Sequence, residues 1–137
     1  MEKKVLVVDD HEPTRRLIRT LLESERREAY VVEEAASGAE CLRKVDEKWP
    51  FHLVILDINL PDMDGYTVCR ALRSVHPEAS IVFLSAHRDL KAFNAAVDAG
   101  GDSYLMKPVD RSSLSAAARL FSRLERRPSA SPSGANP

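Results

Sequence analysis

Short runs of consecutive apolar residues recur along the chain, with longer amphipathic stretches between them. Four of the runs are VLVV (5–8), LVIL (53–56), IVFL (81–84) and YLM (104–106), and a fifth, less apolar run is AYVVEEA (29–35). A strand with one face in water alternates apolar and polar residues, whereas unbroken apolar runs are typical of strands covered on both faces. The pattern therefore predicts five strands of a parallel sheet.

The stretches between these runs have the apolar spacing of amphipathic helices. The five predicted stripes consist of Leu17, Ile18, Leu21 and Leu22; Leu42 and Val45; Val68, Cys69 and Leu72; Leu90, Phe93 and Val97; and Leu114, Ala117, Ala118, Phe121 and Leu124. Pro13 suits the first turn of the first helix, and Asp110 or Ser112 could cap the last. A strand–helix unit repeated in this way, with right-handed crossovers, predicts a doubly wound α/β sandwich.

Length and charge narrow the class of protein. A chain of 137 residues, 44% of them hydrophobic and 30% charged, is typical of one soluble globular domain. Since 20 basic residues face 21 acidic ones, neither nucleic acid nor an anionic membrane is an expected partner. The apolar run in the N-terminal segment MEKKVLVVDD is too short for a signal peptide or a membrane span, so we expect a cytoplasmic protein.

Two further features concern the cysteines and the C-terminal end. Cys41 and Cys69 are far apart and outside any CxxC pattern, so both are interpreted as small core residues. From Arg127 the sequence RPSASPSGANP contains no apolar residue larger than alanine. We therefore expect one domain over residues 1–125, followed at 126–137 by a disordered Pro/Ser-rich tail or a truncated linker.

Polar residues follow four of the predicted strands at the point where each strand ends. Asp9 and Asp10 follow the first, Asp57 the third, Ser85 the fourth and Lys107 the fifth. In open parallel sheets the carboxyl ends of the strands share one edge, and ligands bind there. We therefore expect three carboxylates, a hydroxyl and an ammonium group to converge at this edge.

Carboxylates held close together must either share a proton or recruit a cation. A ligand set made only of oxygens, with room for water and phosphate, suits Mg²⁺ better than zinc or a calcium cage. A metal-assisted Asp57 could act as a nucleophile toward phosphorus and form an acyl phosphate. Ser85 and Lys107 would then supply a hydrogen bond and a positive charge to the phosphoryl oxygens.

Four motifs together make the sequence similar to a known family. The acid pair DD (9–10), LDINLPDMDG (56–65), LSA (84–86) and YLMKP (104–108) resemble the receiver domain of bacterial two-component response regulators, and the match runs from about residue 4 to residue 124. The resemblance is to a stand-alone, chemotaxis-regulator-like receiver. It implies a flavodoxin-like fold with five parallel strands in the order 2-1-3-4-5.

The resemblance also implies a role for each acidic residue. Asp57 corresponds to the phosphoacceptor, and Asp9 and Asp10 to the residues that hold Mg²⁺ directly or through water. The backbone carbonyl of Asn59 would be a further metal ligand. Asp62 and Asp64 belong to a PDMDG turn, and no chemistry is assigned to them.

On the other side of the site, Lys107 resembles the phosphate-binding lysine, with a cis peptide bond to Pro108. Ser85 and Tyr104 match a switch pair in which the hydroxyl moves to the phosphate and the aromatic ring turns inward. The resemblance implies that His87, like Asn59, borders the phosphoryl group, and we hypothesise that His87 tunes the lifetime of this group. His11 is interpreted as a solvent-exposed loop residue without a partner.

The resemblance implies a signalling module rather than an enzyme. Its phosphoryl donor would be a phosphohistidine on a sensor histidine kinase or a histidine phosphotransfer protein. The surface of the fourth helix, fifth strand and fifth helix would then control a downstream effector protein. Three versions stay open: a diffusible effector, an intermediate in a phosphorelay, and a receiver excised from a longer regulator.

Two rival functions are less compatible with the residues. A haloacid-dehalogenase-like phosphatase places a second acid two residues after its nucleophile, but this chain has Asn59 there and has no cap segment that could enclose a substrate. A flavodoxin-like FMN binder needs a phosphate-cradling loop after the first strand. Here that loop reads DDHEPTRR, whose acids would repel phosphate.

Overall fold

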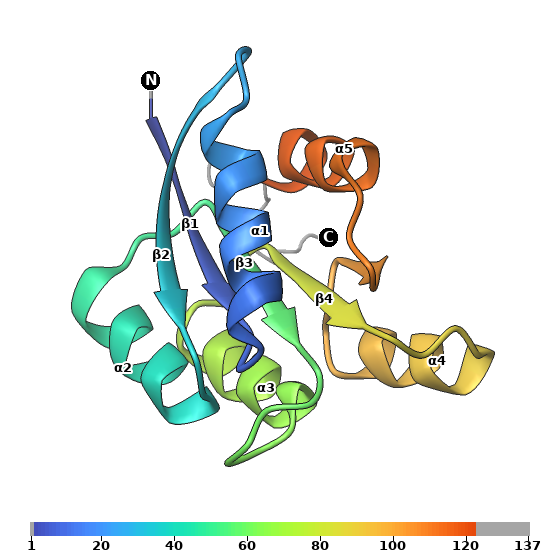
Figure 1. Cartoon of the computed structure of the whole chain (residues 1–137). Coiled ribbons are helices and arrows are strands. Elements are labelled where there is room, and N and C mark those ends of the chain that lie inside the picture. The colour runs from blue at the N-terminus through green and yellow to red at the C-terminus, as the bar shows by residue number, and fades with distance from the viewer. Residues whose placement is uncertain (1, 123–137) are drawn as a thin grey trace, which may run out of the picture.

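The computed structural model describes residues 2–122, so Leu124 and the predicted tail at 126–137 lie outside the described residues. Strands and helices alternate along the whole of this part (Figure 1). The elements are β1 (Glu2–Val8), α1 (Glu12–Glu23), β2 (Ala29–Ala35), α2 (Gly38–Lys48), β3 (Leu53–Asp57), α3 (Gly65–Val75), β4 (Ile81–Ser85), α4 (Leu90–Asp98), β5 (Ser103–Met106) and α5 (Arg111–Phe121).

All neighbouring strands pair in parallel, in the order β2-β1-β3-β4-β5. The predicted fold class and strand order are therefore confirmed. β3 is the central strand, and every residue of β3 and β4 is buried. This burial explains why the first four residues of each strand, LVIL and IVFL, are all apolar.

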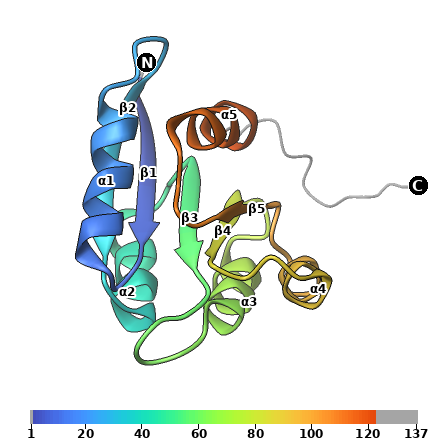
Figure 2. The same ribbon diagram turned by 45° about the vertical axis from the view of Figure 1, so that its right-hand side comes forward.

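Helices cover both faces of the sheet (Figures 1 and 2). Alternate residues of a strand therefore pack against different helices. Leu53 and Ile55 of β3 pack in the cluster that includes α1 and α5, whereas Val54 and Leu56 pack in the cluster that includes α2, α3 and α4. Successive side chains of a strand point to opposite faces, so β3 contributes to both halves of the core. That arrangement fixes the position of Asp57 at the end of the strand.

Each helix begins at a polar N-cap residue, as its unsatisfied first-turn amides require. The caps are His11, Ser37, Asp64, Asp89 and Asp110. The structure selects Asp110 rather than Ser112 as the cap of α5, and Pro13 does lie in the first turn of α1.

His11 lies at an exposed loop position, as expected, but the interpretation that it has no partner is wrong. Its Nδ1 lies 2.6 Å from Thr14 Oγ1 and accepts the Thr14 N–H at 3.3 Å, so His11 caps α1. Cys41 and Cys69, in contrast, are buried free cysteines, as expected.

The apolar stripe of α4 faces outward. Leu90, Phe93 and Val97 keep 71%, 49% and 54% of their surface exposed, whereas Ala96 and Ala99 are buried. The ring of Phe83 fills the space between β4 and this part of the chain, because a Cβ at Gly101 would lie 2.5 Å from it. On this segment the small side chains Ala96 and Ala99 therefore face the core, and the large apolar ones lie on the surface.

Candidate functional site

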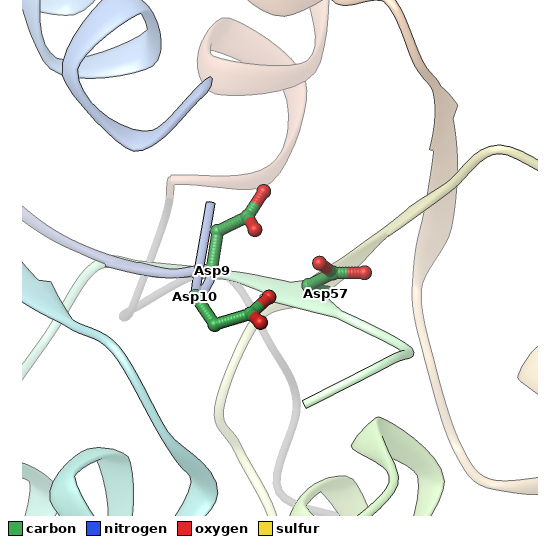
Figure 3. A group of neighbouring side chains, drawn as sticks. All are labelled: Asp9, Asp10 and Asp57. Carbon is green, nitrogen blue, oxygen red and sulfur yellow. The ribbon is translucent and has the colours of Figure 1, made fainter. Parts of the chain in front are cut away.

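The three predicted acids meet where β1 and β3 end. One carboxylate oxygen from each of Asp9, Asp10 and Asp57 lies within 4.8 Å of the others, and the side chains face a shared space (Figure 3). Asp9 is fully buried and Asp57 is 3% exposed, whereas Asp10 is exposed. The cluster is therefore anchored in the core and open on one side.

The main chain and a guanidinium group hold Asp9 in place. Its N–H donates to the Ala35 carbonyl of β2 at 3.0 Å, and its Oδ1 accepts the His11 N–H at 2.9 Å. Arg15 of α1 donates from Nη1 to the Asp9 carbonyl at 2.8 Å and from Nε to Glu34 at 2.7 Å. This role of Arg15 was not predicted from the sequence. The position of Arg15 at the beginning of the helix that follows the acid pair was the available signal.

Lys107 reaches the cluster from beyond β5. Its Nζ lies 2.9 Å from Asp9 Oδ2 and 3.0 Å from Asp57 Oδ2. The contact with Asp57 is a hydrogen bond. The contact with Asp9 is a close ion pair without hydrogen-bond geometry, so the buried Asp9 Oδ2 has no hydrogen-bond partner. Three carboxylates thus face one ammonium group, which leaves an excess of negative charge.

This environment changes the acidity of two groups. Burial first, and then the neighbouring Asp9, raises the pKa of Asp57 from 3.8 to about 6, against the opposing effect of Lys107. Burial alone would lower the pKa of Lys107, but its close contacts with the carboxylates of Asp9 and Asp57 outweigh burial and raise it. At neutral pH the ammonium group is therefore charged and Asp57 is mostly ionised.

The predicted switch residues converge on the peptide groups of His87. Ser85, at the end of β4, is buried, and its Oγ accepts the His87 N–H at 2.9 Å. The Tyr104 hydroxyl donates to the His87 carbonyl at 2.6 Å. The Lys107 N–H donates to the Ser85 carbonyl at 2.8 Å, and the Lys107–Pro108 bond is cis, as the resemblance implied.

The PDMDG turn does more than reverse the chain. Asp64 caps α3 by accepting the Thr67 N–H at 2.8 Å. Gly65 lies so close to β3 that a Cβ on it would be 2.8 Å from Ile58 Cα and nearer still to the Asp57 carbonyl. Its N–H donates to the Ile58 carbonyl at 2.6 Å, so the missing side chain lets α3 begin directly beside the strand end.

The residues present fit a hard cation. The clustered ligand atoms are all carboxylate oxygens, and the buried Asp9 Oδ2 has a lone pair that no hydrogen bond uses. Hard divalent cations prefer such oxygens, and their charge would balance the excess negative charge. This acidic group could therefore bind a metal ion.

Comparison with known proteins agrees with this fold and site. The family model described as the response regulator receiver domain matches residues 5–119. The chain is 36% identical over 125 residues to the Staphylococcus aureus response regulator protein VraR, covering 91% of this chain and 59% of VraR. It is 35% identical over 135 residues to a probable transcriptional regulator, ycf27, of Cyanophora paradoxa, covering 98% of this chain and 54% of the relative.

Solved structures show the same similarity. A CheY-like receiver domain protein from Methanospirillum hungatei superposes with a TM-score of 0.80 at 30% identity, covering 93% of this chain and 97% of that one. A putative response regulator from Chloroflexus aurantiacus gives a TM-score of 0.83 at 30% identity, covering 92% and 100%.

The fold and the acidic edge define a receiver-type α/β domain, and the chain belongs to the response regulator receiver family of two-component signalling. Phosphorylation of an aspartate and use of Mg²⁺ are general properties of this family. The chain spans a little over half the length of the curated relatives it matches, at 54% and 59%. Within residues 2–122, the helices are all too short or too polar to cross a membrane.

Proposed function

We propose that Asp57 is the phosphoacceptor of this chain, and that the donor is a phosphohistidine of a sensor histidine kinase or a histidine phosphotransfer protein. An Asp57 carboxylate oxygen attacks the phosphorus, the P–N bond breaks, and its electron pair leaves with the imidazole nitrogen of the donor. The observation that carries the proposal is the site itself. A buried strand ends on Asp57, whose Oδ2 lies 3.0 Å from Lys107 Nζ and whose carboxylate lies beside two further carboxylates.

Asp9, Asp10, Asp57 and the Asn59 backbone carbonyl would hold Mg²⁺ in this proposal. The bound ion would supply positive charge against the negative oxygens of the phosphoryl group. The Asn59 N–H donates to Asp57 Oδ1 at 3.1 Å, which fixes the orientation of the carboxylate. With that contact and the Lys107 contact at Oδ2, Asp57 is held in one orientation before a donor arrives.

Lys107 and Ser85 act on the phosphoryl group after transfer. Lys107 keeps its charge because two carboxylates raise its pKa above the ordinary value, despite burial. A phosphoryl group on Asp57 adds roughly 1.5 to 2 negative charges, which favour arrangements that bring Lys107 and the Ser85 hydroxyl to its oxygens. Ser85 now accepts a hydrogen bond from His87, so a move toward phosphate would alter the loop between β4 and α4.

That loop connects the site to the proposed output surface of α4, β5 and α5. The Tyr104 hydroxyl is bonded to the His87 carbonyl, and the Tyr104 ring lies 6.1 Å from that of Phe93. Phe93 belongs to the exposed apolar stripe of α4, with Leu90 and Val97. A change at Ser85 would therefore reach a surface whose exposed apolar groups suit a downstream effector protein.

The direct test is incubation of the chain with Mg²⁺ and a small acyl phosphate, followed by intact mass measurement. We expect one added phosphoryl group on the wild type and none on Asp57→Asn. Asp46→Asn is a matched control, because Asp46 is an exposed acid of α2 outside the site. Labelling of Asp57→Asn, or multiple turnover of phosphate esters by the wild type, would contradict the proposal.

A further inference from the structure

Asp62, in the loop between β3 and α3, is bonded to the beginning of α2. Its Oδ1 accepts the Gly38 N–H at 2.8 Å, and its Oδ2 accepts the Ala39 N–H at 2.8 Å. The two groups are 24 and 23 positions away in the sequence, so this is a tertiary contact. The pKa of Asp62 lies below its ordinary value because these amides, that of Ala39 first, stabilise the carboxylate.

Asp62 supplies hydrogen-bond acceptors for two first-turn amides of α2 that the local cap does not bind. Ser37 Oγ accepts the Glu40 N–H at 3.1 Å, and Glu40 Oε1 accepts the Ala36 N–H at 2.8 Å. These contacts leave the Gly38 and Ala39 amides of the first turn, which Asp62 then binds. The first amides of a helix have no partner within the helix, and a carboxylate is their most favourable acceptor.

Packing reinforces the connection beside Asp62. A Cβ at Gly38 would lie 2.5 Å from Met63 Cγ and 2.8 Å from Met63 Sδ, so the Met63 side chain occupies the space that glycine leaves. Gly38 is buried and Met63 packs against the core cluster below α2 and α3. The turn is therefore held to α2 by two hydrogen bonds and by a packed side chain.

The same loop contacts the phosphoacceptor. The Asn59 N–H donates to Asp57 Oδ1, and Asn59 pairs with Asp64 in an isolated antiparallel bridge. Asp62 lies in the turn closed by this bridge, so a constraint on Asp62 limits the positions open to Asn59. One end of the loop is thus attached to the reacting carboxylate and its tip is attached to α2.

We propose that Asp62 is a positioning residue of the metal site, which holds the loop against α2 so that the Asn59 main chain stays beside Asp57. This inference rests on the proposed function of the site. Outer contacts that orient metal ligands commonly contribute 10- to 100-fold to affinity, and Asp62 acts on a single backbone ligand. We therefore expect Asp62→Ala to weaken Mg²⁺ binding by about tenfold, the low end of that range.

The test compares the wild-type chain with Asp62→Ala, Asp62→Asn and Ser37→Ala by calorimetric titration with Mg²⁺. Ser37→Ala is the matched control, because it removes a cap from the same helix while leaving the loop attached. It should lower the unfolding midpoint and leave the Mg²⁺ dissociation constant within about twofold, since the loop contact is intact. Asp62→Asn keeps one acceptor oxygen and should restore part of the affinity.

Two further readouts separate positioning from charge and from general stability. Loss of an exposed charge would matter less at high salt, whereas a positioning effect persists, so titrations at about 0.15 M and 0.5 M salt should give the same ratio. Hydrogen exchange at the Asn59 amide should accelerate in metal-free Asp62→Ala and not in Ser37→Ala.

The proposal is overturned if Asp62→Ala binds Mg²⁺ like the wild type, if Ser37→Ala weakens binding equally, or if the difference disappears at high salt. Unchanged Asn59 exchange would overturn it as well. A wild type that binds no Mg²⁺ would instead refute the proposed function, and this inference with it.

Discussion

Asp57 should destabilise the metal-free fold at neutral pH. Burial and Asp9 raise its pKa from 3.8 to about 6. Between these two pH values, Asp57 keeps its proton in the folded protein and has lost it in the unfolded chain. The contribution of Asp57 to stability therefore decreases as the pH rises from about 4 to about 6. At ~1.4 kcal/mol per pH unit, the cost above pH 6 is at most about 3 kcal/mol.

Asp57→Asn removes this cost but also one partner of Lys107, whose ammonium group remains close to Asp9. We therefore expect a net stabilisation of about 1 to 2 kcal/mol at pH 7.5, less than the full electrostatic cost. The difference between the two proteins should shrink as the pH falls toward 4, because Asp57 of the wild type is then protonated in both states.

Urea unfolding in EDTA, at a series of pH values from 4 to 8, measures this difference. Trp49 is the single tryptophan and stacks on His76 at 3.9 Å, so its fluorescence reports loss of the packing between α2 and α3. Titrating groups that do not contact Asp57 are common to both proteins and cancel in the comparison, so the remaining difference comes from Asp57 and its neighbours Asp9 and Lys107. Saturating Mg²⁺ should stabilise the wild type more than the variant and narrow the gap. An Asp57→Asn protein that is less stable at pH 7.5, or whose advantage grows toward pH 4, would refute the reasoning.

Three further predictions concern other parts of the site. Lys107→Met should retain the fold by circular dichroism and lose at least tenfold in labelling by acyl phosphate, because transition-state charge stabilisation of this kind is typically large; an unchanged rate would exclude Lys107 from the transfer. His87→Ala should change the decay rate of phosphorylated protein, measured by intact mass over time, and an unchanged rate would remove the proposed tuning role. Gly65→Ala should lower the free energy of unfolding by roughly 1 to 3 kcal/mol, because its Cβ meets the backbone of β3, and a neutral result in urea unfolding would contradict the close approach.

The order of elements could be predicted from the sequence because each signal is local. An unbroken apolar run such as LVIL records burial on two faces, and β3 is buried at every position. Asp110 and Pro13 likewise mark helix starts through groups only a few residues away. The strand order needed the family resemblance, since the apolar pattern alone does not say which strands are neighbours.

The local sequence pattern did not predict the burial or the hydrogen-bond partners of residues whose contacts are distant in the sequence. The stripe Leu90, Phe93 and Val97 has helical spacing, yet it is exposed. Ala96 and Ala99 face the core instead, in the segment where the ring of Phe83 packs against Gly101. Asp62 was interpreted only as a turn residue, because its amide partners belong to another helix. In both places the deciding contact is remote in sequence.

The sequence by itself determined the alternation of strands and helices and the polar residues at the strand ends. Side chains repeat their direction every 2.0 residues in a strand and every 3.6 residues in a helix, so the spacing of apolar residues within a segment indicates its secondary structure. Tertiary structure alone decided the distances and the charge balance. It brings Lys107 to Asp57 across 50 positions, buries both Asp9 and Asp57, and raises the pKa of Asp57 chiefly through the burial of Asp57 itself. Desolvation and long-range pairing depend on what surrounds a group in space, and no short stretch of sequence contains that information.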